Sequence, residues 1–69
     1  MKYQFTFYNT ERKYKPITVT ITPRPHEKIQ SLKKRAIQKA CAERYWAWDE
    51  MLYKYKYDKF RYRVLKEDE

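Results

Sequence analysis

The sequence Tyr53-Lys54-Tyr55-Lys56-Tyr57 alternates aromatic rings with cations, and Phe60-Arg61-Tyr62-Arg63-Val64 repeats the alternation almost at once. A period of two is the side-chain period of a β-strand, so the rings would point to one face of a sheet and the cations to the other. The pattern predicts a β-hairpin of strands 51–56 and 60–65 around a turn at residues 57–59. One face of this hairpin would be an aromatic core surface and the other a basic surface.

Two further alternating segments lie nearer the N-terminus. Residues 1–8 alternate aromatic with polar side chains, and residues 15–22 alternate isoleucine or valine with threonine. β-Branched residues at nearly every position make residues 15–22 the clearest strand of the chain. The two segments predict a first hairpin with a connecting loop of about five or six residues.

A helix is expected between the two hairpins. It would begin at Pro23 or near His26, after the prolines that end the second strand, and it would end within residues 42–47. Lys33 falls among the apolar residues of its inner face and would have to extend its ammonium group out of the core. That inner face is the expected core stripe of Ile29, Leu32, Ala36, Ile37, Ala40 and Cys41.

The order of these elements, ββαββ, predicts a two-layer α+β domain, in which one helix packs on one face of a four-stranded antiparallel sheet. The single domain would span residues 1–66, and the acidic residues 67–69 would form a frayed tail. Residues 45–50 either end the helix or begin the third strand.

Composition excludes several classes of protein. The chain contains no glycine, so it has no P-loop, dinucleotide fingerprint or nucleophile elbow. His26 and Cys41 are each the only residue of their type, and about 22 Å of helix would separate them, so they form neither a catalytic dyad nor a zinc site. We therefore expect no enzyme, no metal and no cofactor. A single cysteine, no apolar run of about 20 residues and no signal peptide favour a soluble cytoplasmic protein.

Positive charge is the strongest functional signal. The 69 residues include 17 Lys and Arg against 9 Asp and Glu, a formal net charge of +8. Three of the acids are residues 67–69, and without them the net charge is +11. So much charge on a small domain attracts polyanions, whether nucleic acid, an acidic membrane leaflet or an acidic protein.

Two basic surfaces are predicted. The first is the sheet face away from the helix, where cations and threonine hydroxyls could contact phosphates. The rings expected to be free to stack on bases are Tyr8, Tyr14 and either Tyr45 or Trp46. The second is a ridge on the back of the helix, where like charges four residues apart are slightly unfavourable without an anion. The expected sheet-face cations are Lys2, Lys54, Lys56, Arg61 and Arg63, and the expected ridge cations are Arg24, Lys28, Arg35 and Lys39.

Two functions fit these surfaces. The first is a non-enzymatic nucleic-acid-binding domain that contacts phosphates with little sequence specificity. The alternative is a small regulatory or inhibitory protein that docks on an acidic protein surface through Tyr45, Trp46 and Trp48, ringed by Lys and Arg. For the two indoles, plugging the end of the core is the favoured interpretation. The sequence leaves the partner and the oligomeric state open.

Overall fold

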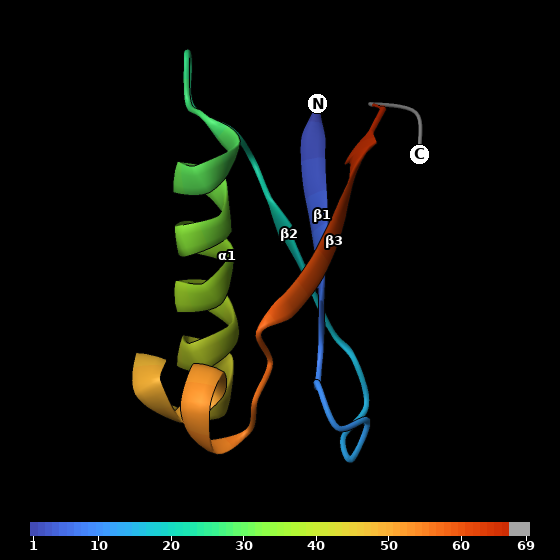
Figure 1. Ribbon diagram of the computed structural model, residues 1–69. Coiled ribbons are helices and arrows are strands. Elements are labelled where there is room, and N and C mark those ends of the chain that lie inside the picture. The colour runs from blue at the N-terminus through green and yellow to red at the C-terminus, as the bar shows by residue number, and fades with distance from the viewer. Residues whose placement is uncertain (67–69) are drawn as a thin grey trace.

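The computed structural model of the protein describes residues 1–66, so the frayed tail expected at residues 67–69 lies outside the described residues. The chain forms a small α+β fold, with a three-stranded antiparallel sheet in the order β2-β1-β3 and a helix on one side of it (Figure 1). The fourth strand predicted from the sequence is absent from the described residues. The elements are β1 (Lys2–Tyr8), β2 (Ile17–Ile21), the helix α1 (Ile29–Arg44), the short π-helix η1 (Glu50–Lys54) and β3 (Lys59–Leu65).

The first hairpin is confirmed. β1 and β2 pair antiparallel with Phe5 opposite Val19, so the apolar residues of both strands share the face that α1 covers. Their connecting loop, residues 9–16, is longer than expected. Without glycine, this loop turns through Arg12, which adopts the left-handed conformation at φ 58°.

The core lies between α1 and strands β1 and β2. Phe5, Val19 and Leu32 are buried together, as predicted, and five of the six stripe residues are buried while Ile29 is partly buried. Lys33 lies within the apolar stripe, but its ammonium group does not enter the core. Its Nζ is 4.5 Å from the ring centroid of Phe60, so the charge stays near solvent over an aromatic face.

Helix α1 ends at Arg44, within the predicted range, because Tyr45 adopts the left-handed conformation (φ 57°, ψ 34°). The N–H of Tyr45 donates to the carbonyl of Ala42 (3.5 Å) and the N–H of Trp46 to that of Cys41 (3.0 Å). These two bonds form a Schellman motif, with tyrosine where glycine is usual. Residues 45–50 therefore fit neither alternative in full: Tyr45 ends α1, and residues 48–50 begin a new helical turn that continues into η1.

The prediction of a strand at residues 51–56 is wrong, because this stretch contains the π-helix η1. Its side chains do not alternate between two faces: Tyr53 is 75% exposed, Tyr55 is half-buried and Tyr57 is buried. Packing explains the difference, since Met51 is fully buried at the end of the core and Tyr57 donates its hydroxyl to the carbonyl of Lys15 (2.8 Å). Burial of Met51 and Tyr57 therefore decides the local structure more than the alternation of the sequence does.

Strand β3 forms as predicted, but it pairs with β1 instead of with residues 53–57. In this register Tyr62 lies opposite Phe5 and Val64 opposite Tyr3, so the ring-bearing side of β3 continues the core face. Helix α1 packs mainly against β2 and reaches β3 through Lys33 at the Phe60 ring (Figure 1). Tyr62 and Val64 consequently remain 50% and 44% exposed.

Candidate functional site

The face of the sheet opposite α1, called the sheet face below, collects the polar side chains of all three strands. The three strands contain no aspartate or glutamate, so no Lys or Arg of this face has an acidic residue in its own strand. The cations Lys2, Lys59, Arg61 and Arg63 are all exposed. By register and burial, the sheet face comprises Lys2, Gln4, Thr6, Tyr8, Thr18, Thr20, Lys59, Arg61, Arg63 and the apolar Leu65.

Cross-strand contacts order the middle of the sheet face. Arg63 lies opposite Gln4 and donates from Nε to its Oε1 (2.9 Å). Thr6 lies between Arg61 and Thr18, and the two threonine hydroxyl oxygens are 3.4 Å apart. Hydroxyl and guanidinium donors therefore stand in neighbouring rows, an arrangement suited to the oxygens of an anion.

A hollow of about 950 Å³, called the loop hollow below, opens at the end of the sheet face where β1 ends and β3 begins. Three cations, Arg12, Lys59 and Arg61, contribute to its lining. Tyr8 and Tyr14 line it as well, and both keep part of their ring exposed. The loop hollow thus combines aromatic rings with positive charge.

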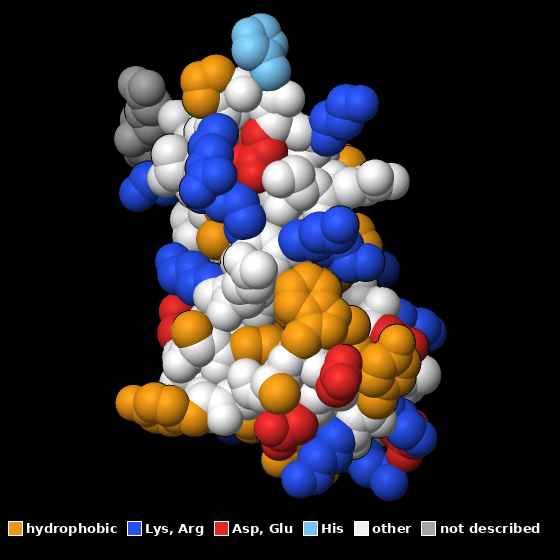
Figure 2. Space-filling view, turned by 90° about the vertical axis from the view of Figure 1, so that its left-hand side faces the viewer, with side chains coloured by type: hydrophobic (Ala, Val, Ile, Leu, Met, Phe, Trp, Pro, Cys, Tyr) orange, Lys and Arg blue, Asp and Glu red, His pale blue; other side chains and the backbone are white. Residues whose placement is uncertain are grey.

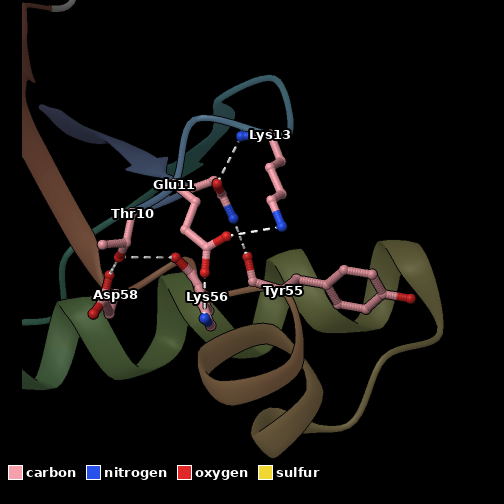
Figure 3. Close-up of polar contacts among 7 residues, drawn as sticks. Thr10, Glu11, Lys13, Tyr55, Lys56 and Asp58 are labelled. Atoms are coloured by element: carbon pink, nitrogen blue, oxygen red, sulfur yellow. Dashed lines mark hydrogen bonds and ion pairs between the residues drawn. The ribbon is translucent and has the colours of Figure 1, made fainter.

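A polar network fixes the loop 9–16 to the segment that follows η1 (Figure 3). Buried Asn9 accepts the N–H of Lys13 at its Oδ1 (2.8 Å) and donates from Nδ2 to the carbonyl of Tyr55. The N–H of Thr10 donates to the carbonyl of Lys56 (2.9 Å), and its hydroxyl bonds to Asp58. The loop that lines the hollow is therefore held in place by its contacts with residues 55–58.

Glu11 gathers two cations in the same network. Its carboxylate accepts from Lys56 and lies 2.9 Å from Lys13 Nζ, and these contacts lower its pKa from 4.5 to about 2 (Figure 3). Lys56 therefore does not belong to the sheet face. Neither does Lys54, which sits in η1 with its Nζ 5.5 Å from the ring centroid of Tyr55. Both placements were predicted wrongly, because they depended on the missing strand.

The four cations predicted to form a ridge on the back of the helix do not lie together in the structure. Arg35 pairs with Glu27 and donates to the carbonyl of Thr22 (3.3 Å), while Lys39 donates to the carbonyl of Thr20 (2.8 Å). Both cations therefore lie on the flank of α1 that faces the edge of β2, not on its back. Arg24 and Lys28 are exposed before the helix begins. Seen from the α1 side, Lys and Arg are separated by hydrophobic, acidic and neutral side chains (Figure 2).

Glu27, the partner of Arg35, is held in place by two further hydrogen bonds. The backbone N–H of Arg24 donates to Glu27 (2.9 Å) and holds the pKa of this carboxyl below its usual value, with help from the Ser31 hydroxyl (2.7 Å) and Arg35. Arg35 is thus occupied by a structural ion pair.

The aromatic residues after α1 differ in exposure. Trp46 is half-buried and stacks on Tyr55 with ring centroids 4.4 Å apart, and Trp48 also packs against the core. The interpretation of the indoles as core plugs is confirmed. Tyr45 is 95% exposed.

Sequence reasoning missed two cations of the site. Lys59 is in phase with Arg61 and Arg63, so extending the alternation by one step would have found it. Arg12 gives no such signal, because its position in the loop hollow depends on a left-handed backbone conformation in a loop.

Residues 1–66 contain no group of three or more His, Cys, Asp or Glu able to hold a metal, and no helix among them is long and apolar enough to cross a membrane. Burial raises the pKa of the Cys41 thiol, which makes it less reactive. Comparisons with protein families, curated proteins and solved structures find no match to this chain. The fold and site define a small α+β domain with a cationic sheet face.

Proposed function

We propose that the protein is a non-enzymatic nucleic-acid-binding domain, which contacts phosphates through the sheet face with little sequence specificity. The observation that carries this proposal is the grouping of Lys2, Lys59, Arg61 and Arg63 on strands without a single acidic residue. Such a surface attracts polyanions and gives up its counterions on binding.

The distribution of the acids supports the proposal. Among the described residues, Glu11, Glu27 and Glu43 each pair with a lysine or arginine outside the strands. Asp58, which lines the loop hollow, is engaged by the hydroxyl of Thr10. Three acids are therefore paired away from the sheet face, while Asp58 keeps its charge at the end of that face where the loop hollow opens.

The loop hollow favours single-stranded over double-stranded nucleic acid. Tyr8 and Tyr14 offer ring surface beside Arg12 and Arg61, and unpaired bases stack on such rings with little regard to sequence. A strand could run along β3 with its phosphates on the cations and place a base in the hollow.

The alternative function, docking on an acidic protein surface through Tyr45, Trp46 and Trp48, has weaker support. Both indoles pack against the core, which leaves Tyr45 as the one fully exposed anchor of the three.

A salt titration of binding to single- and double-stranded oligonucleotides tests the proposal. The logarithm of the binding constant should fall linearly with the logarithm of the salt concentration. Arg61→Glu with Arg63→Glu should flatten this slope by about one for each phosphate that the variant no longer binds.

The matched control is Lys28→Glu with Lys34→Glu, which changes the net charge equally on exposed residues of the α1 side. The control should keep most of the slope. If the control abolishes binding and the sheet-face variant does not, the site lies on the helix. A folded wild-type protein that binds neither DNA nor RNA at low salt would disprove the function.

A further inference from the structure

Strand β3 forms a bare edge of the sheet. It pairs with β1 on one side, and on its other side no strand lies within the described residues. In the described chain, no backbone hydrogen bond outside the β1–β3 ladder involves residues 59–65. An extended edge with unpaired N–H and C=O groups is a template for one more strand.

Next to this edge lies an apolar surface on the α1 side, called the aromatic ledge and made by Tyr3, Phe60, Tyr62 and Val64. Tyr62 touches Tyr3 and Phe5 with ring centroids 6.0 and 5.7 Å apart, yet half of its surface is exposed. The ledge is exposed because α1 covers mainly the other edge of the same face, beside β2. A strand added to β3 would continue it.

The charges of β3 decide which strand fits. The three residues of β3 that are charged at neutral pH, Lys59, Arg61 and Arg63, are all cations on the sheet face. A second copy that continued the aromatic ledge would bring these cations opposite their own counterparts, with Cβ atoms only about 4.5–5.5 Å apart, which is unfavourable. A strand with carboxylates at alternate positions makes the same contacts favourable.

We propose that β3 binds an extended acidic segment of a partner protein, in which Asp or Glu alternates with apolar residues. The segment would become the fourth strand of the sheet. Its backbone would pair with the bare edge of β3, its carboxylates would lie beside Arg61 and Arg63, and its apolar side chains would cover Tyr62 and Val64. This inference concerns a different ligand from the proposed function, although both use Arg61 and Arg63, so the two ligands should compete.

The probe is a short synthetic peptide in which glutamate alternates with valine, added to the full chain and followed by the backbone amide signals. Amides of β3 should shift and become protected from hydrogen exchange, while those of β2 should change little. A scrambled peptide of equal composition should bind at least about tenfold more weakly, because it cannot present both faces.

Methylating alternate backbone nitrogens of the peptide, in each of the two possible phases, isolates the strand pairing. One phase should lose at least about tenfold in affinity and the other should bind as before, because only one set of N–H groups faces β3. Arg61→Glu with Arg63→Glu should transfer the preference to a peptide that alternates lysine with valine, while the unchanged β1–β2 amide signals report an intact fold.

Three outcomes would overturn the inference. Equal binding of both methylated phases would mean that charge alone attracts the peptide. Absence of binding would mean that the cations serve only to keep the edge from pairing. A dimer in sedimentation that shields β3 would mean that a second copy occupies the edge.

Discussion

The two edges of the sheet differ in how completely the rest of the chain covers them. At β2, the side chains of Arg35 and Lys39 reach down from α1 to the carbonyls of Thr22 and Thr20, and every inward-facing residue is buried. At β3 no part of the described chain pairs with the outer edge, and Tyr62 and Val64 stay half-exposed. One helix causes both conditions, because a helix about 10–12 Å across covers roughly two strands spaced about 4.8 Å apart. The β2 side of the molecule therefore contains the buried core, and the β3 side keeps apolar side chains and backbone groups exposed.

The comparison predicts that truncations to alanine have very different costs on the two sides. Leu32→Ala, under the covered strands, should lower the free energy of unfolding by about 2–5 kcal/mol, a large share of the stability of a small domain. Val64→Ala, on the β3 side, should cost less than about 1 kcal/mol because its side chain is already 44% exposed. Urea denaturation of both variants measures the difference, and similar midpoints would show that the β3 side is part of the core.

The same contrast explains what sequence could predict. Residues 15–22 and 60–65 were predicted as strands, and the structure contains β2 and β3 there, because apolar and polar side chains alternate in both. Residues 53–57 show an equally regular alternation and still form no strand. Here burial of Met51 and the contacts of Tyr55 and Tyr57 at the end of the core override local periodicity.

The candidate site was predictable to the extent that it lies on strands. Lys2, Arg61 and Arg63 are exposed on the expected face, because their phase along the strand fixes the direction of the side chain. Lys54 and Lys56 were misplaced with their strand. Arg12 and the loop hollow arise from tertiary contacts between residues 9–16 and 55–58, which no local pattern records. The pairing of β3 with β1 could not be predicted either, because alternation fixes the two faces of a strand but not which strand lies beside it.

A smaller effect is expected where the segment after η1 joins the β2 side. Tyr57→Phe should lower the free energy of unfolding by about 0.5–1.5 kcal/mol, because the variant loses the hydrogen bond to the carbonyl of Lys15 and leaves that acceptor without it. Tyr53→Phe is the matched control, since Tyr53 is 75% exposed, and should change stability by less than about 0.5 kcal/mol. Thermal or urea unfolding of both variants gives the comparison. Equal effects would mean that residues 53–57 are not fixed to the β2 side.

The smallest expected effect is the pH dependence that Glu11 confers on the loop between β1 and β2. Bonds from Lys56 and Lys13 lower its pKa from 4.5 to about 2, so the folded state favours the charged carboxylate. A carboxyl group whose pKa falls on folding stabilises the protein above its ordinary pKa, and this contribution is lost as the pH drops from about 4.5 towards 2. Because the pair is exposed, added salt should reduce the effect. Urea midpoints measured across this pH range should fall less steeply for Glu11→Gln than for the wild type, and Lys56→Met should remove part of the same dependence. Parallel curves for all three proteins would show that these ion pairs do not fix the loop to the β2 side, which would confine the stable region to the core beneath α1.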